Sequence, residues 1–252
     1  MSFSLGRFDV GAMLRCGLDL RRAVQASGTL EEAAGAVVQY FHDECRDEAT
    51  GERQCVLVRF FKTHPFGGLP DDLQAFACRM FGPVPPHDDT RCLVLLATAG
   101  AEPEWNDRRL SRGHQAIPLP SAEVVERSPM VAQLIRELGL DVAHVVAPRP
   151  ELIRGLEGKT HGVFHVAEAA GSPYIPAQEA FVLPHGVRSV VGCGGIVHDG
   201  DLFALVLFSR VPIPAESAER FRQIALQLKI AILPVATSFA PAAAVEAAPP
   251  PA

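Results

Sequence analysis

The stretch from Gly186 to Arg210, GVRSVVGCGGIVHDGDLFALVLFSR, contains two β-prone runs separated by a tight turn. Asp199-Gly200 lies between the runs, and glycine accepts the positive φ that tight hairpin turns require. We therefore expect two antiparallel strands here. The second run, LFALVLF from Leu202 to Phe208, is almost wholly apolar, which indicates a strand with both faces covered. This run is the best candidate for the central strand of a sheet.

Three amphipathic helices are predicted around this hairpin. In residues 9–26 the apolar positions recur at near-helical spacing, with arginines between them. Thr29 followed by Glu32 is a capping-box signature that opens a second helix, which fades near residues 43–46. A third helix begins near Ala215. Its apolar positions follow helical spacing and are Phe221, Ile224, Ala225, Leu228 and Ile232.

Four further β-prone runs supply the rest of the sheet. They are CVLVRFF (55–61), RCLVLLATA (91–99), AIPLP (116–120) and GVFHV (162–166). Proline and glycine in residues 63–70 should end the first of these strands, and Asp71 or Asp72 can cap a short helix after it. A helical pattern starts at Ser121, whereas residues 142–162 are irregular and punctuated by proline.

The end of the chain resembles the last third of GAF domains, the ligand-binding modules of bacterial signalling proteins. The matching features are Gly186-Val-Arg-Ser-Val190 entering a strand, the turn at Asp199 to Asp201, the strand LFALVLFSR and a closing helix. The strings LVRFFKTHPFG, EPEWNDRR and GSPYIPAQEAFV resemble a subgroup, the GAF-like sensory segments found upstream of bacterial histidine kinases. The resemblance implies an α/β (α+β) fold with a central antiparallel sheet of about six strands. Terminal helices should cover one face, and an irregular segment the other.

This reading divides the chain into an N-terminal helical extension (1–28), one GAF-like sensory domain (29–233) and a disordered Ala/Pro-rich tail (234–252). The formal charge of −6 argues against a nucleic-acid or anionic-membrane surface. No apolar run reaches the roughly 18 residues that span a bilayer, and the start of the chain lacks a signal-peptide pattern. We therefore expect a cytoplasmic protein with neither nucleic-acid nor membrane partners.

In GAF domains the small-molecule pocket lies between the sheet and the covering segment, so the resemblance directs attention to residues 100–188. This segment concentrates aromatic, cationic and hydrogen-bonding side chains that can orient a ligand in an apolar cavity. With one cysteine from the hairpin, the candidate ligand-binding residues are Trp105, Arg108, Arg109, His114, His161, His165, Tyr174, Phe181, Arg188 and Cys193.

Each candidate also has a purely structural interpretation. Trp105 could anchor its loop, and Arg108 and Arg109 could pair with neighbouring carboxylates. His161 and His165 have the spacing of metal ligands on a helix, but Gly162 argues against a helix, and no carboxylate or cysteine completes a set. No metal site is therefore predicted.

Six cysteines are scattered without a CxxC pair, which fits buried reduced thiols. Some members of the GAF family use cysteine to reduce free methionine sulfoxide or to attach a bilin. Cys193 lacks a nearby resolving partner in the sequence and the Cys-His or Asp-x-Cys-Phe string that bilin attachment usually brings. A core thiol is the favoured interpretation of this residue.

The function expected from these observations is that of a non-catalytic sensor or regulatory module that binds a small molecule, with no cofactor identified. It would signal through a homodimer or a partner, such as a histidine kinase of a bacterial two-component system. One alternative is a protein-interaction scaffold whose GAF fold has lost its ligand. Another is a redox or haem sensor, suggested by the six cysteines and nine histidines.

Overall fold

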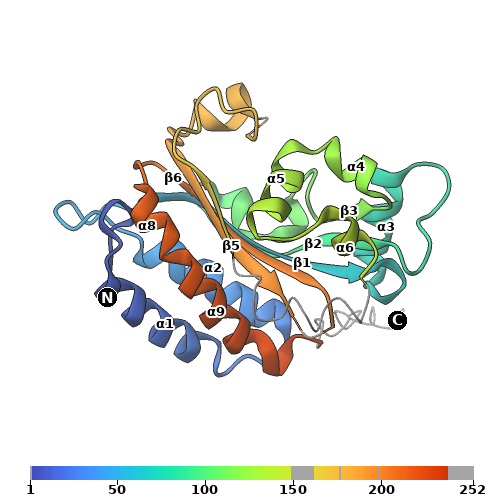
Figure 1. Cartoon of the computed structure of the whole chain (residues 1–252), viewed down its shortest axis with the longest axis horizontal. Coiled ribbons are helices and arrows are strands. Elements are labelled where there is room, and N and C mark those ends of the chain that lie inside the picture. The colour runs from blue at the N-terminus through green and yellow to red at the C-terminus, as the bar shows by residue number, and fades with distance from the viewer. Residues whose placement is uncertain (1, 149–161, 176, 198, 238–252) are drawn as a thin grey trace, which may run out of the picture.

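The computed structural model describes residues 2–148, 162–175, 177–197 and 199–237. A single antiparallel sheet forms the middle layer, with long helices on one face and an irregular segment with short helices on the other (Figure 1). The layered α/β architecture predicted from the sequence is confirmed. The predicted tail lies outside the described residues from position 238 onward.

The sheet has six strands in the order β3-β2-β1-β6-β5-β4, and every neighbouring pair is antiparallel. The expected hairpin is present, and Gly200 in its turn has a φ of 83° that favours glycine. β6 pairs with β1 and β5 and is buried along its whole length, as its apolar sequence predicts. The strands are β1 (Cys55–Pro65), β2 (Arg91–Gly100), β3 (Ala116–Leu119), β4 (Val163–Val166), β5 (Ser189–Ile196) and β6 (Leu202–Ser209).

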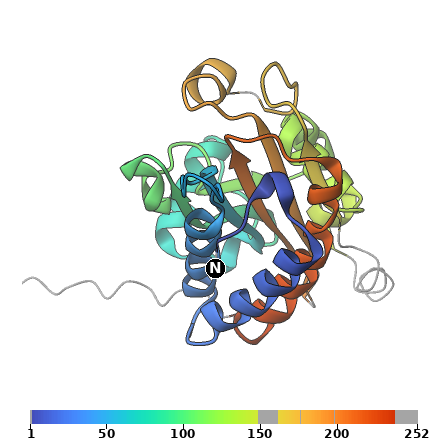
Figure 2. The same cartoon turned by 90° about the vertical axis from the view of Figure 1, so that its left-hand side faces the viewer.

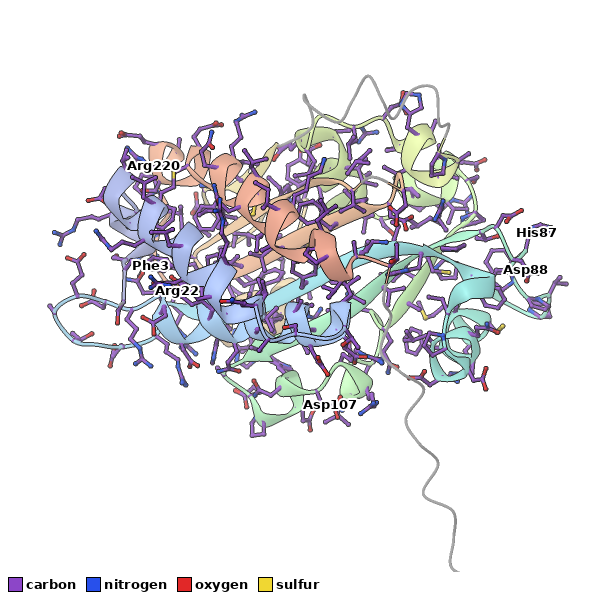
Figure 3. The ribbon with its side chains drawn as sticks, turned by 90° about the horizontal axis from the view of Figure 1, so that it is seen from below. Phe3, Arg22, His87, Asp88, Asp107 and Arg220 are labelled. Atoms are coloured by element: carbon purple, nitrogen blue, oxygen red, sulfur yellow. The ribbon has the colours of Figure 1, made fainter. Side chains whose placement is uncertain are left out.

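Three long helices cover one face of the sheet: α1 (Val10–Val24), α2 (Leu30–Glu44) and α9 (Phe221–Ile232). The side chains of Asp9 and Thr29 accept hydrogen bonds from the first turns of α1 and α2, so both helices begin where the capping pattern predicts. α1 and α9 lie side by side on the outside of this face (Figures 2 and 3). The helix of the N-terminal extension therefore packs into the same core as the rest of the chain.

The opposite face is covered by parts of the middle of the chain, here called the covering segment: the described residues between 101 and 188 that lie outside β3 and β4. It contains several short helices, seen above the sheet in Figure 1. α6 forms inside a stretch that the sequence analysis describes as irregular, because Asp141 caps its first turn. The elements are η3 (Pro103–Asn106), η4 (Arg108–Leu110), α4 (Ala122–Glu126), α5 (Pro129–Glu137), α6 (Val142–Val146) and the π-helical turn η5 (Gln178–Val182).

Two boundaries differ from the sequence-based prediction. β1 continues to Pro65, because Thr63 and His64 pair with β2 and Pro65 lies only at the strand's end, where its missing N–H is tolerated. The closing helix is divided at Arg220 into α8 (Ala215–Glu219) and α9. The remaining elements are η1 (Leu5–Arg7), η2 (Phe66–Gly68), α3 (Asp71–Phe81) and η6 (Leu233–Val235). Within the described ranges, no helix is both long and apolar enough to cross a membrane.

Candidate functional site

Arg59 and Thr98 form a short polar row on the face of the sheet that packs against the covering segment. Arg59 pairs with Thr98 on β2 and with Val206 on β6. Its neighbours Val58 and Phe60 belong to the core under the helices, so Arg59 points to the other side, toward the covering segment. The surrounding side chains on that side are apolar and form a core with the covering segment. The middle strand thus places a cation in an otherwise apolar layer.

The buried polar atoms of this row lack partners within the described part of the chain. Arg59 is half-buried, its Nε is buried without a hydrogen bond, and Thr98 Oγ1 is in the same state. Desolvation lowers the pKa of Arg59 to about 10. Leaving a buried donor unsatisfied costs roughly 1–3 kcal/mol, and more for a charged group. A site that retains this cost is a candidate for binding something that removes it.

His114 lies within the electrostatic reach of this row. It follows η4 and precedes β3, and part of the residue is accessible to solvent. Desolvation, followed by the positive charge of Arg59, lowers the pKa of His114 to about 4, so its imidazole is neutral at pH 7. A neutral imidazole both donates and accepts a hydrogen bond. The row therefore has a partly accessible polar neighbour whose pKa is lowered mainly by desolvation and further by the charge of Arg59.

An aromatic cluster lies next to the row, at the level of Leu57 on β1. Phe208 on β6 pairs with Leu57, and the ring of Phe181 meets that of Phe208 at 5.1 Å between centroids. Trp105 packs edge-on against Phe181 at 5.4 Å and against His185 at 4.6 Å. These four rings form an aromatic wall one row away from Arg59.

Gly100 at the end of β2 is needed for this wall. A Cβ placed there would lie 2.9 Å from the indole ring of Trp105 and 3.1 Å from Leu57 Cδ1. The indole therefore rests directly on the end of the strand. This contact supports the structural interpretation of Trp105 as an anchor for its loop, and the half-buried ring remains partly accessible.

The structure brings three of the predicted site residues close to the polar row. Trp105 and Phe181 form the aromatic wall, and the charge of Arg59 acts on His114. Arg108 is instead buried at the edge of the sheet, where it bonds Glu31 of α2 and lies 3.6 Å from Asp72 of α3. It pairs, as its structural interpretation requires, but with distant carboxylates rather than neighbouring ones.

The other predicted residues are dispersed. Cys193 and His165 lie on the opposite face of the sheet: Cys193 is fully buried in the core under the helices, and His165 Nε2 contacts the backbone oxygen of Ile213 at 2.9 Å. Burial raises the pKa of the Cys193 thiol. Exposed positions are occupied by Arg109, Tyr174 and Arg188, and His161 lies outside the described residues.

Sequence reasoning missed Arg59, Thr98 and His185. One signal was available, because Arg59 is the only charged residue in the run CVLVRFF. In a strand covered on both faces, such a residue must either find a partner or be tolerated for a function. Thr98 carries no comparable signal, since threonine is common in strands.

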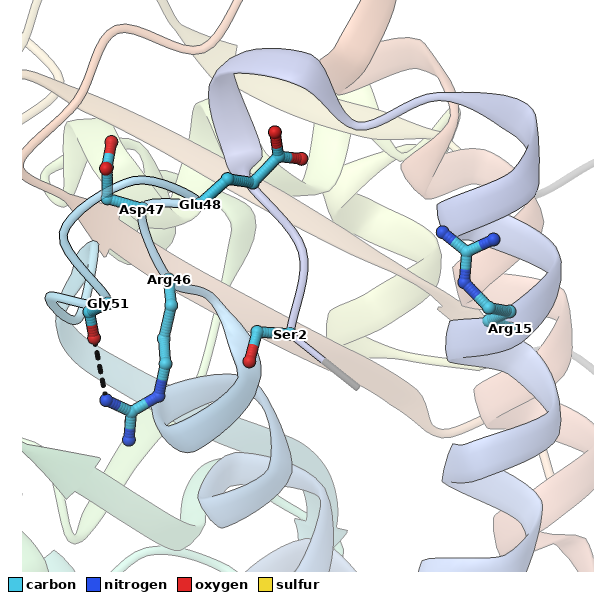
Figure 4. Close-up of a pocket in the computed structure, with 6 residues that line it drawn as sticks. All are labelled: Ser2, Arg15, Arg46, Asp47, Glu48 and Gly51. Carbon is cyan, nitrogen blue, oxygen red and sulfur yellow. Dashed lines mark hydrogen bonds between the residues drawn. The ribbon is translucent and has the colours of Figure 1, made fainter.

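Two surface pockets lie elsewhere. One of about 440 Å³ lies between α1 and the 46–51 loop, where Arg46 donates a hydrogen bond to the backbone oxygen of Gly51 (Figure 4). Its walls are Ser2, Arg15, Arg46, Asp47, Glu48 and Gly51. The other, of about 500 Å³, lies among α4, α5 and α6. Neither is lined by the sheet, so both lie apart from the polar row. Across the described ranges, no three His, Cys, Asp or Glu side chains are placed to hold a metal ion.

The arrangement of a central antiparallel sheet, terminal helices on one face and a covering segment on the other is the arrangement that the sequence resemblance implies. The layers and the strand pairing therefore agree with the GAF-like fold expected from the sequence. No protein-family model matches the sequence, and no curated protein is significantly similar to it. Similar solved structures nevertheless exist.

A free methionine-R-sulfoxide reductase from Neisseria meningitidis is 13% identical, with a TM-score of 0.45 and 88% of each chain covered. The GAF domain of a phosphoenolpyruvate-protein phosphotransferase from Coxiella burnetii is 16% identical, with a TM-score of 0.42, covering 87% of this chain and 92% of that one. The phycoerythrobilin-bound GAF domain of a cyanobacterial phytochrome is 13% identical, with a TM-score of 0.41 and coverage of 88% and 94%. All three TM-scores are below 0.5, so these likenesses carry no argument, and the description of this protein as GAF-like rests on its layers and strand pairing.

Proposed function

We propose that this protein is a non-catalytic regulatory module that binds a small molecule between the sheet and the covering segment. The observation that carries the proposal is the polar row, in which Arg59 Nε and Thr98 Oγ1 are buried without partners in the described part of an apolar layer. A ligand that supplied those partners would recover the cost of burying them. The aromatic wall beside the row offers apolar contact area to the same ligand.

Binding is favoured over cysteine chemistry by the location of the thiols. All six cysteines lie in, or pack against, the core under the helices, on the far side of the sheet from the polar row. Burial is the main cause that raises the pKa of Cys16, Cys92 and Cys193, which makes the nucleophilic thiolate scarce. The redox alternative therefore receives no support from the candidate site.

The output of such a module would pass through contacts of the outer helices, with a second copy or with a signalling partner such as a histidine kinase. Leu14 and Leu18 of α1 are exposed, and so are Leu226 and Ile230 of the adjacent α9. These four side chains form the surface here called the outer helix patch. The apolar positions of the closing helix that the sequence singles out, Phe221 to Ile232, are all turned inward and fully buried. The patch is therefore made of other residues.

Native mass spectrometry of the purified protein tests the proposal, together with the fluorescence of Trp105, the chain's only tryptophan. We expect a co-purifying molecule of small mass, and a change in Trp105 emission when it is removed and restored. Protein that carries no small molecule, and whose emission no cell extract fraction changes, would contradict the proposal.

An interaction scaffold without a ligand is the second candidate. It is favoured by the packing of Trp105, Phe181 and Phe208, which fill the space at one end of the covered face. Tyr174 is 36% exposed and takes no part in this packing. The same mass measurement separates the two, since a scaffold would carry no bound molecule and would instead retain a protein partner on pull-down through the outer helix patch.

A further inference from the structure

We infer that the ligand of this site is a small anion, a carboxylate or a phosphate ester, whose charged group binds Arg59 and whose apolar part lies against the aromatic wall. The inference rests on the proposed function and adds the chemical class of the ligand.

The charges near Arg59 do not neutralise it within the described residues. No described carboxylate forms an ion pair with the guanidinium, and desolvation is the only cause that shifts its pKa. His114 is neutral at pH 7, and Thr98, which lies opposite Arg59 on β2, carries no charge. Glu102, beside the aromatic wall, lies 3.7 Å from His185. A neutral ligand would leave a desolvated cation, whereas an anion would compensate it.

The donors of the row match an oxyanion. A guanidinium presents its N–H groups as a planar fork that binds carboxylate or phosphate oxygens in pairs, and Nε is one of the two donors on its side edge. The buried Nε lacks an acceptor, so one oxygen of the anion would meet it. Thr98 lies directly opposite on β2, about 5 Å away between Cβ atoms, and its free hydroxyl could donate to the same anion.

The spacing of the rows sets the minimum length of a ligand that contacts both. The level of Leu57 and Phe208 is two residues from that of Arg59 along the strand, which corresponds to about 7 Å. A molecule whose anion lies on Arg59 can therefore reach the aromatic wall with an apolar group no larger than a single ring. A monocyclic or short-chain acid is therefore long enough to contact both Arg59 and the aromatic wall.

Binding of an anion would also be reported by His114. The charge of Arg59 is one of the causes that lower the pKa of this imidazole, and an anion beside Arg59 would offset that charge. The pKa of His114 should therefore rise when an anionic ligand binds. A neutral ligand at the same place would leave the electrostatic contribution of Arg59 unchanged.

The test uses three matched probes of the same ring size: benzoate and phenyl phosphate as anions, and benzamide as the neutral counterpart of benzoate. Their binding to the full chain is followed by Trp105 fluorescence and by NMR titration of the His114 ring. Arg59→Gln removes the charge, Arg59→Lys keeps it without the planar fork, and Arg127→Gln removes an exposed charge from the covering segment as a control.

We expect at least one anionic probe to bind about tenfold or more tightly than benzamide, and to raise the pKa of His114. Arg59→Gln should abolish that preference, Arg59→Lys should weaken it, and Arg127→Gln should leave it unchanged. Equal affinity for benzamide and the anions, no binding of either anion at millimolar concentration, or an anion preference that survives in Arg59→Gln would overturn the inference.

Failure of the inference can be told apart from failure of the proposed function. A neutral or cationic molecule that co-purifies with the protein and changes Trp105 emission would overturn the anionic class and still support a small-molecule module. Variants that unfold are recognised by their thermal transitions. Arg59→Gln is expected to fold, since it removes a desolvated charge without a described partner.

Discussion

Arg59 and Thr98 lie directly opposite each other on β1 and β2, and a buried polar atom of each lacks a hydrogen-bond partner within the described ranges. Both face the covering segment, between apolar rows of the same sheet. Such a pair is unfavourable for stability, because burial removes water without supplying a substitute. A ligand would supply the missing hydrogen-bond partners. The pair is therefore expected to lower the stability of the free protein and to favour binding.

Arg59→Gln should stabilise the protein in the absence of ligand by about 1 kcal/mol, because it removes a desolvated charge. Arg108→Gln is the matched comparison, since Arg108 is equally an arginine but is paired with Glu31 and Asp72. We expect it to destabilise by about 1–3 kcal/mol. Urea unfolding of both variants measures the difference. A loss of stability in Arg59→Gln as large as in Arg108→Gln would mean that Arg59 holds the fold together.

A buried ion-pair network at the other end of β1 should be critical for folding. Lys62 is 1% exposed, and its Nζ lies 2.7 Å from Asp201 Oδ2 and 3.3 Å from Asp199 Oδ2. Lys62→Met leaves Asp201 with Arg91 as its remaining cation within the described residues and should cost about 3 kcal/mol in the free energy of unfolding.

The control for this network is an exposed ion pair of the covering segment. Arg127 lies 2.8 Å from Glu123, and both side chains are largely in solvent. Arg127→Met should therefore change the free energy of unfolding by less than about 0.5 kcal/mol. Similar values for the two variants in chemical denaturation would contradict the importance assigned to the network at Lys62.

Stability should fall as the pH is lowered from 6.5 toward 3, in part because of His64. Desolvation, followed by the charge of Lys62, lowers the pKa of His64 from 6.5 to about 3 in the folded protein. Between pH 6.5 and 3 the unfolded chain therefore binds a proton at His64 that the folded chain does not bind. The stabilising contribution of the neutral imidazole is present in full only above the unfolded pKa. The contribution is on the order of a few kcal/mol.

His64→Gln should flatten the dependence of the unfolding free energy on pH between 6.5 and 3, whatever its effect at pH 7. His87→Gln serves as the control, because its side chain is 81% exposed, and should leave the slope unchanged. An identical slope in wild type and His64→Gln would show that other groups dominate acid unfolding.

The outer helix patch should mediate self-association. Leu18 on α1 is 55% exposed, so Leu18→Asp removes apolar contact area without entering the core. In a dimer this change should weaken association by at least about tenfold and leave the thermal transition of the monomer unaltered. Leu20→Asp, at a fully buried position of the same helix, should unfold the domain instead.

Light scattering or sedimentation at high micromolar concentration measures this association. A monomer mass for the wild-type protein would remove the dimer, and the patch would then be assigned to a different partner. A dimer that persists in Leu18→Asp would place the interface elsewhere on the molecule.

Local sequence determined the elements and the layers. α2 begins after Thr29 because the side chain of Thr29 caps its first turn. LFALVLF forms a central strand because its side chains are apolar on both faces. The hairpin follows from Asp199-Gly200 between the two β-prone runs, since glycine accepts the positive φ that a tight turn requires. These features depend on neighbours in the chain, and a sequence displays them directly.

The tertiary structure decided which side chains share a face. Cys193 and His165 were grouped with Trp105 by their place in the sequence, yet strand alternation and pairing turn them to the helical side. The strand pairing is irregular between Cys55 and Leu57, and two successive residues of β1, Val56 and Leu57, both face the covering segment. The face that each side chain takes therefore cannot be found by counting alternate residues in the sequence.

The polar row is likewise decided by the tertiary structure. The sequence contains an arginine inside an apolar run, but its opposition to Thr98 and its distance from any described carboxylate arise only when β1 pairs with β2 and the covering segment closes over them. Strand register is set by contacts between segments far apart in the chain, and a one-residue shift would move every side chain to the other face. The sequence by itself therefore determined the GAF-like layers, and the long-range pairing of strands decided where the candidate site lies.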